Sequence, residues 1–153
     1  MVENAKPKHR SECPVSISLE VFGDRWSLLI IRDLMVRGYR TFKEFEHSGE
    51  GIATNILAHR LKKLQAAGII DTEYDLTDRR KLKYRLTQKG IDLAPVLLEI
   101  LIWGARHEQT GAPRRMIEHM EANREAVLAE VRRCWQERDP RPFLPSFTSG
   151  GRV

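Results

Sequence analysis

Hydrophobic and polar residues recur between positions 51 and 68 with the period of an amphipathic α-helix. Leu61 and Leu64 fall within about 40° of Leu57 around the helix axis, and the three define a narrow stripe that we expect to be buried. The opposite arc, about 140° wide, carries no carboxylate. Its members are Asn55, Ala58, His59, Lys62 and Lys63. Because a solvated helix face usually mixes charges of both signs, this arc favours contact with base edges and phosphates.

Three helices are predicted before this stretch. Their expected spans are 14–22, 25–36 and 42–46. Pro14 suits the first turn of the first helix, and Thr41 can cap the third. The middle helix is apolar around most of its circumference, which is typical of a helix at the centre of a core.

The hydrophobic period changes from 3.6 to 2 after Gly68, which predicts two β-strands. Apolar residues alternate with acidic residues over 70–76 and with basic residues over 81–86. Keeping both apolar rows on one face pairs the acidic row with the basic row. Arg79 and Arg80 form a tip with few acidic partners, and Lys81 follows directly, so the pattern predicts a hairpin with a basic tip.

Longer helical patterns follow the hairpin. Thr87 can cap a helix that runs from residue 88 to about His107, in which Pro95 either introduces a kink or marks a later start. A last helix is expected over 114–137, with an apolar stripe and balanced charges. The Pro, Ser and Gly content from Asp139 onward predicts a disordered tail.

The distribution of charge indicates an anionic partner. The chain has 153 residues and a net charge of +5, and 41% of its residues are hydrophobic, which suits one domain with a sizeable core. Residues 53–90 contain nine basic and four acidic residues, so this segment alone accounts for the whole positive excess. Nucleic acid is the partner that such clustering favours.

Other functional classes lack their sequence signatures. Two cysteines, Cys13 and Cys134, form no disulfide framework, and no apolar run is long enough to span a bilayer. We therefore expect a cytoplasmic protein that does not associate with membranes. The five histidines show no metal-ligand spacing, and neither a phosphate-binding loop nor a nucleophile motif occurs. We expect no enzyme activity, no cofactor and no metal site.

Helix, turn, helix and then a hairpin with a basic tip is the element order of a winged helix-turn-helix, whose second helix enters the major groove while the wing contacts phosphates. Several motifs add a family resemblance. They are Cys13-Pro14, Gly23–Trp26, Arg40–Phe45, Gly51–Leu57 with Arg60-Leu61, Leu64 and Gly68-Ile69, and Tyr84–Gly90. Together they resemble the HxlR-type transcriptional regulators over roughly residues 13–106. The resemblance implies a dimeric winged helix-turn-helix repressor or activator.

The expected fold is mainly α with a small β-hairpin wing and long C-terminal helices. Its expected parts are a flexible arm (1–12), a winged helix-turn-helix domain for DNA binding and dimerisation (13–110), an additional C-terminal helix (111–138) and a disordered tail (139–153). The segments 93–103 and 116–135 carry more apolar surface than one small domain covers, which predicts a homodimer and an inverted-repeat operator.

The recognition helix over 53–67 and the wing supply the expected contacts with double-stranded DNA. These contacts are assigned to Thr54, Asn55, Ala58, His59, Lys62, Lys63, Arg79, Arg80 and Lys81. Asn55 and His59 suit base edges, although phosphate contact is the alternative for each, and Arg60 is close enough to the buried stripe to pair with an acid instead. The alternative function is a helical protein-interaction module that docks an acidic partner.

Two features bear on an effector, whether small molecule or oxidant, whose identity the sequence leaves open. Cys13 stands at a helix start, where the dipole lowers a thiol pKa, and the resemblance implies oxidant or electrophile sensing by a cysteine at this place. A structural thiol is the alternative. An effector pocket could be lined by aromatic residues, with core packing as the alternative; these are Trp26, Phe42, Phe45 and Trp103.

Overall fold

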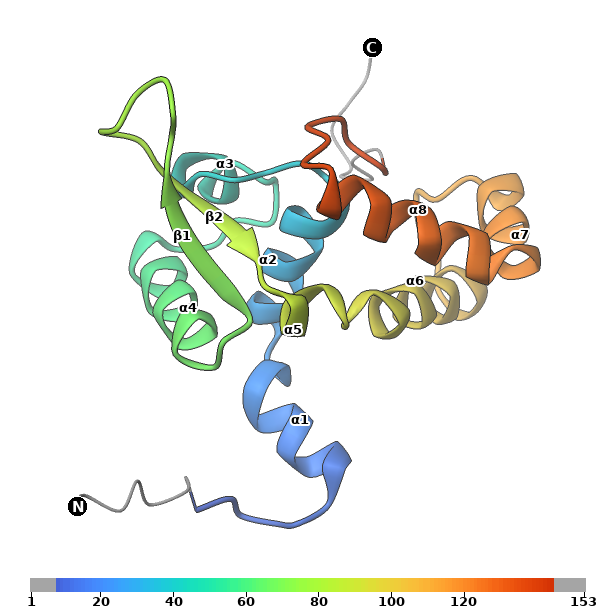
Figure 1. Cartoon of the computed structure of the whole chain (residues 1–153). Coiled ribbons are helices and arrows are strands. Elements are labelled where there is room, and N and C mark those ends of the chain that lie inside the picture. Colours follow the sequence, from blue (N-terminus) through green and yellow to red (C-terminus); the bar gives the residue numbers. More distant parts are fainter. Residues whose placement is uncertain (1–7, 145–153) are drawn as a thin grey trace.

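The computed structural model describes residues 8–144 and shows a mainly helical protein with one β-hairpin (Figure 1). In chain order the elements are α1 (Pro14–Phe22), α2 (Arg25–Val36), α3 (Phe42–Glu46), α4 (Thr54–Ala66), β1 (Ile70–Tyr74), β2 (Leu82–Leu86), α5 (Gln88–Ile91), α6 (Ala94–His107), α7 (Arg114–Ala122) and α8 (Arg124–Gln136). Helices α3 and α4 followed by the hairpin form the predicted winged helix-turn-helix. In the described part of the chain, no helix has both the length and the hydropathy that crossing a membrane requires.

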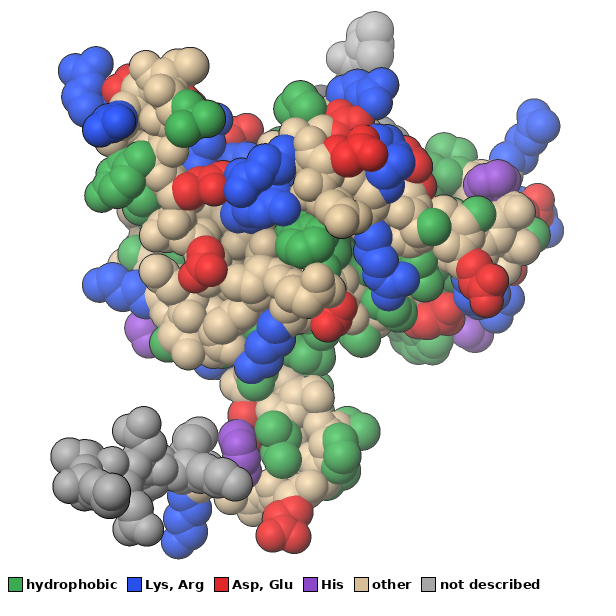
Figure 2. Space-filling view, in the orientation of Figure 1, with side chains coloured by type: hydrophobic (Ala, Val, Ile, Leu, Met, Phe, Trp, Pro, Cys, Tyr) green, Lys and Arg blue, Asp and Glu red, His purple; other side chains and the backbone are tan. Residues whose placement is uncertain are grey.

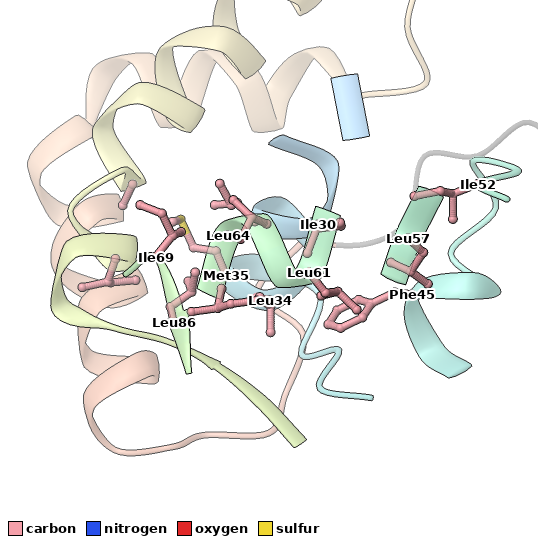
Figure 3. Packing of buried hydrophobic residues seen from close by; sticks show 14 of the residues in the cluster. Ile30, Leu34, Met35, Phe45, Ile52, Leu57, Leu61, Leu64, Ile69 and Leu86 are labelled. Atoms are coloured by element: carbon pink, nitrogen blue, oxygen red, sulfur yellow. The ribbon is translucent and has the colours of Figure 1, made fainter. Parts of the chain in front are cut away.

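Helix α2 is the centre of the main hydrophobic core, as its apolar circumference predicts. Ile31 and Leu34 are almost completely buried, and α4 packs its predicted stripe against them. Figure 3 shows the three leucines of this stripe, Leu57, Leu61 and Leu64, among the labelled core residues. None of the three is more than 2% exposed, so the orientation of α4 follows from its own sequence period.

Local capping interactions define the starts of α2 and α3, and a glycine ends α4. Asp24 caps α2 by accepting a hydrogen bond from Ser27 N at 2.9 Å. Thr41 and Glu44 form a reciprocal capping box at the start of α3, which confirms the cap predicted there. Gly68 has φ of +74°, a left-handed conformation that favours glycine and turns the chain from α4 into β1.

The hairpin has the register that the alternation predicts. Its antiparallel pairing extends from Ile70 opposite Leu86 to Tyr74 opposite Leu82, so acidic positions of β1 lie opposite basic positions of β2. The outer part differs from the expected apolar face, because Tyr74 is 66% and Leu76 99% exposed. The hairpin extends beyond the helical core there, and its apolar row has no element to cover it (Figure 1).

The prediction of one helix from residue 88 to 107 was wrong, and the later start at Pro95 is what the structure contains. Helix α5 ends at Ile91, Asp92 and Leu93 form a turn whose dihedral angles stay in the right-handed helical region, and α6 begins at Ala94 with Pro95 in its first turn. Proline has no N–H group and its ring collides with the carbonyl four residues earlier, so a helix cannot continue through it without distortion. The break separates α5, beside the hairpin, from α6.

The prediction of one helix over 114–137 was also wrong. Asn123 leaves helical geometry with φ −131° and ψ 38°, and its side-chain amide donates to the carbonyl of His119 at 2.9 Å. An asparagine side chain that bonds nearby backbone competes with the helical ladder in this way. Helices α7 and α8 therefore fold back along α6, and Met120 and Val127 are buried in a second hydrophobic cluster inside the chain.

The chain ends differ in part from the predicted arm and tail. Phe143 N and Leu144 N both donate to the carbonyl of Val36, at 2.7 and 2.9 Å, so the described part of the predicted tail is packed on the end of α2. At the other end, His9 Nδ1 lies 2.8 Å from a carboxylate oxygen of Glu20 on α1. The remaining residues of both segments, 1–7 and 145–153, lie outside the described part.

Candidate nucleic-acid interface

The outward face of α4 carries the side chains that the helical period assigned to it. Thr54, Asn55, His59 and Lys62 are exposed, and Ala58 and Lys63 are half-buried at the edges of the face. In Figure 2 this helix lies at the left edge of the molecule, where Lys, Arg and His side chains gather. Because the buried leucines hold the opposite side of α4, these groups present amide, imidazole and ammonium donors to solvent.

Asp24 reduces the positive charge at one edge of this face. Arg60 Nε donates to a carboxylate oxygen of Asp24 at 2.9 Å, and Lys63 Nζ lies 3.8 Å from the other oxygen. Partial burial alone would raise the pKa of Asp24, but hydrogen bonds from Ser27 and the neighbouring Arg60 lower it. Arg60 thus ties α4 to the start of α2, as its position near the buried stripe allowed.

Two other contacts refine the chemistry of the face. Thr54 Oγ1 donates to Glu46 Oε2 at 3.2 Å, so a carboxylate borders the first turn of α4. His59 Nδ1 lies 3.0 Å from Arg60 Nη1, an arrangement that leaves Nε2 as the ring nitrogen without a recorded partner among the described residues. Within this part of the chain, no hydrogen bond to the Asn55 side chain is recorded, so its amide keeps both donor and acceptor capacity.

The hairpin ends in exposed basic side chains. Arg79, Arg80 and Lys81, hereafter the basic tip, are all exposed, and Figure 2 shows Lys and Arg side chains at this end of the molecule. Among residues 8–144, the ion pair recorded for Arg80 is with Asp78, two positions earlier, at 3.2 Å, and the arginine side chain is 93% exposed. Such an exposed ion pair is weak, so Arg80 can release Asp78 and bind a DNA phosphate instead.

The base of the hairpin is fixed to the helical core from two sides. Tyr84 N donates to the carbonyl of Arg40 at 2.7 Å. On the other side, Arg85 lies over the ring of Trp135 and donates to its carbonyl at 2.9 Å, while Trp135 Nε1 donates to Leu86 O. These contacts set the position of the basic tip relative to α4, and both lie on the same side of the molecule in Figure 1.

A sequence profile of the HxlR-like helix-turn-helix family matches residues 21–112, more than half of the chain. The chain belongs to this family. Similar proteins agree: the uncharacterized HTH-type transcriptional regulator YybR of Bacillus subtilis is 31% identical over 96 residues, which cover 63% of this chain and 76% of YybR. This HxlR-like protein is thus a DNA-binding transcriptional regulator, and its family and relatives are regulators rather than enzymes.

Solved structures of regulators share the fold. The redox regulator HypR in its oxidized form is 30% identical, with a TM-score of 0.56 over 63% of this chain and 99% of HypR. The reduced form of the transcriptional regulator YodB from B. subtilis is 34% identical, with a TM-score of 0.53 over 63% of this chain and 95% of YodB. In both cases the shared part leaves out about a third of the HxlR-like chain.

The sequence assignment missed two exposed side chains beside the predicted face. Lys43 lies on α3, to which only a buried side had been assigned, and Gln65 lies on the last turn of α4. In a helix-turn-helix the first helix crosses the DNA backbone, so the lysine has a suitable position for a phosphate. A helical wheel of residues 42–46 would have placed Lys43 opposite Phe45.

Cys13 of this HxlR-like protein is exposed at the N-cap of α1, as predicted. The backbone N–H groups of Ser16 and Val15 face the thiol and lower its pKa. Burial raises the pKa of the half-buried Cys134 instead. The pKa of Cys13 is therefore shifted down and that of Cys134 up, which is the difference that the N-terminal helix position of Cys13 predicts.

Proposed function

We propose that this HxlR-like regulator binds an inverted-repeat operator as a homodimer, with α4 in the major groove and the basic tip on phosphates. The observation that carries the proposal is the carboxylate-free exposed face of α4, directly opposite a fully buried stripe and beside an exposed basic tip. The proposed contacts are Thr54, Asn55, Ala58, His59, Lys62, Lys63, Arg79, Arg80 and Lys81. Such a regulator acts where chromosomal DNA is, in the cytoplasm.

The two elements have different chemical roles in this proposal. An asparagine amide can bond two edge atoms of adenine, and an imidazole or ammonium group can bond acceptors of guanine, so α4 supplies sequence preference. Arginines on a hairpin tip bond phosphate oxygens in any sequence, so the basic tip supplies affinity and register. Arg60 is assigned a structural role, because Asp24 already accepts from its guanidinium.

We expect the variants Arg79→Ala and Arg80→Ala to weaken binding to all duplexes by a similar factor. Each should reduce the slope of log affinity against log salt concentration by about one, because each removes one phosphate contact and its released counterion. Gel shifts over a series of salt concentrations measure this slope. Arg115→Ala, which removes an exposed arginine from α7, is the matched control and should leave the slope unchanged. A slope that the tip variants do not alter would exclude the hairpin from the phosphates.

Apolar side chains that the chain does not cover favour a dimer. Helix α1 projects from the body (Figure 1) and has no buried residue, with Val15 67% and Leu19 57% exposed. On α6, Ile100 and Trp103 are also exposed. Figure 2 shows hydrophobic side chains on the projecting helix. The predicted interface at 93–103 therefore stays in the proposal, whereas α1 replaces 116–135, whose apolar stripe is largely buried within the chain.

We expect the protein to sediment as a dimer at micromolar concentration. Leu19→Glu should shift it toward the monomer, because a carboxylate would be buried without a partner in the interface. Leu76→Glu is the matched control, since this leucine is 99% exposed on the hairpin and its replacement should leave the dimer intact. A dimer of this kind places its half-sites about one helical turn apart on DNA. A wild-type protein that sediments only as a monomer would refute the homodimer.

We propose that Cys13 senses oxidants, in keeping with its lowered thiol pKa and with the likeness to the redox regulator HypR. Iodoacetamide should alkylate Cys13 faster than Cys134 at neutral pH, because a larger fraction of the first thiol is thiolate. Mass spectrometry of timed digests measures both rates. The variants Cys13→Ser and Cys134→Ser then separate their effects on operator affinity after mild peroxide. Equal loss in wild type and Cys13→Ser would assign Cys13 a structural role.

A further inference from the structure

A cavity of about 530 Å³ lies where the two hydrophobic clusters of the protein meet. It is lined by α2, α6, α7, α8, the segment after α8 and the loop at Gly49 and Glu50, and it is partly open to solvent. Its walls are mainly apolar, with Leu29, Leu97, Leu101, Leu128 and Phe143 among them. Pockets that hold small organic ligands have volumes of roughly 300–1,000 Å³ and similar apolar walls. None of the four aromatic residues proposed from the sequence lines this cavity.

Part of the wall comes from the region beyond the family match. Leu128 and Val131 on α8, and Phe143 and Leu144 after it, lie beyond residue 112. Phe143 and Leu144 are held in place by the hydrogen bonds from their backbone N–H groups to the carbonyl of Val36. Without these residues α2 and α6 would face solvent across an open groove. The C-terminal region thus converts a surface of the winged domain into a cavity.

One end of the cavity is polar because Arg32, Arg37 and Glu50 line it. The Arg37 side chain is only 6% exposed, and its recorded hydrogen bonds all come from Nη1, which donates to Asp33 at 3.2 Å and to the carbonyl of Ser48 at 3.4 Å. Among the described residues no acceptor is recorded for its Nε or Nη2. No fully buried side-chain nitrogen or oxygen there lacks a partner, so these two nitrogens keep accessible surface. The cavity that Arg37 lines is where an acceptor can reach them.

The charged groups at this end are balanced. Arg32 pairs with Asp33 and with Glu50, each at 2.9 Å, while Arg25, which is 68% exposed and does not line the cavity, lies 3.7 Å from Glu50. Arg32 and Arg37 therefore face the two carboxylates of Asp33 and Glu50. A guanidinium that is nearly buried favours a charged acceptor, and its planar fork fits a carboxylate with two parallel hydrogen bonds.

We propose that this cavity binds a hydrophobic monocarboxylate, with its carboxylate on Arg37 and its apolar body among Leu101, Leu128 and Phe143. The carboxylate accepts from the Arg37 nitrogens that have no recorded acceptor among the described residues, and the apolar body fills the aliphatic space between the two hydrophobic clusters. Helix α2 forms one wall of the cavity and carries Asp24 at its start, which holds Arg60 of α4. An effect of the ligand on DNA affinity rests on the proposed function, whereas ligand binding itself does not.

The test uses the full chain, octanoate as the ligand and 1-octanol as its neutral match. Both compete with anilinonaphthalene sulfonate, a hydrophobic anion whose fluorescence increases in apolar sites. Octanoate should displace the dye saturably and at a concentration about tenfold below that of octanol or lower, since charged hydrogen bonds carry the difference. Arg37→Gln should remove this preference. Leu101→Trp, and independently Leu128→Phe, should remove binding of both by filling the cavity.

Control variants separate the cavity from other apolar surfaces. Leu76→Trp adds the same indole on the exposed hairpin and should leave displacement unchanged. Thermal melts show which variants fold. If Arg37→Gln does not fold, the preference of wild type for octanoate and its loss in the filled variants decide whether the cavity is the ligand site. Equal displacement by octanol and octanoate would overturn the proposal, as would unchanged binding in the filled variants. Conversion of Leu128→Phe to a monomer would overturn it as well, because Leu128 lies outside the proposed dimer interface and a second copy would then occupy the cavity.

A gel shift with and without octanoate tests the coupling separately. A change in operator affinity in wild type, absent from Leu128→Phe, is expected if the cavity acts through α2. Displacement of the dye without any change in operator affinity would refute this coupling while the ligand site stands. Failure of the protein to bind any duplex, with or without octanoate, would refute the proposed DNA contacts, and the displacement experiment would still decide the ligand site.

Discussion

Replacement of Leu64 with alanine should lower the free energy of unfolding by about 2–5 kcal/mol, the range for a fully buried leucine whose loss leaves a cavity. Leu64 is 0% exposed in the core cluster around α2 (Figure 3). Urea unfolding followed by circular dichroism measures the change. Lys62→Ala, two residues earlier on the same helix, is the matched control, and its effect should stay within about 0.5 kcal/mol because the lysine is an exposed side chain without a recorded ion pair.

The two variants together test how α4 is divided between core and DNA. Lys62→Ala should weaken DNA binding and leave stability unchanged. Leu64→Ala should lower stability and, at temperatures where the variant is folded, leave DNA affinity unchanged. If Leu64→Ala and wild type unfold at the same urea concentration, α4 does not pack against the core as described. Lys62→Ala that binds every duplex as wild type does would remove Lys62 from the interface.

Elements with strong local signals were predictable from the sequence. The period of three leucines in α4 gave the buried side, and the opposite side then followed from geometry alone. The hairpin was predictable because its alternation continues through both strands and permits one register with acidic and basic rows opposed. Caps such as Thr41 with Glu44 are contained in a few consecutive residues, and their partners needed no knowledge of the fold.

The breaks in the C-terminal helices depend on competition that residue patterns leave undecided. Pro95 is compatible with a kink as well as with a new start, and only the packing of α5 beside the hairpin separates them. Asn123 sits in a continuous charge and apolar pattern, yet its amide bonds the backbone of α7 and the chain reverses there. Composition also predicted a tail at residues whose two apolar side chains, Phe143 and Leu144, are packed against the core.

Long-range contacts explain which parts of the site escaped prediction. The sequence indicated that Arg60 could pair with an acid, but its partner Asp24 lies 36 positions away and is identified only by the packing of α4 on the start of α2. The cavity is similar, because it is formed by segments from α2 to Leu144 that share no motif. Periodicity assigns residues to the faces of individual helices and strands. A cavity forms only where several of these faces meet, which the tertiary fold determines.

Asn55→Ala and His59→Ala should flatten the sequence preference of the regulator, each at a cost of about 1–3 kcal/mol at particular base pairs. Both side chains are exposed on α4, and neither the Asn55 amide nor His59 Nε2 has a recorded partner in the described part of the chain. A group that bonds a base edge in the complex discriminates among bases, because a wrong base leaves its donors or acceptors unpaired. Each variant should therefore lose affinity only for operators that carry the base pair contacted by the replaced side chain.

The measurement is a set of titrations on an operator selected from a random library and on the same duplex with single base-pair changes. In wild type each change should weaken binding, and in Asn55→Ala or His59→Ala one position should become tolerant of all four base pairs. His119→Ala removes an exposed imidazole from α7, away from the proposed DNA and dimer contacts, and is the matched control, with every preference retained. Arg79→Ala should lower the affinity of all these duplexes in parallel. If Asn55→Ala gives the same parallel loss, its amide contacts a phosphate, and sequence preference comes from other residues of α4.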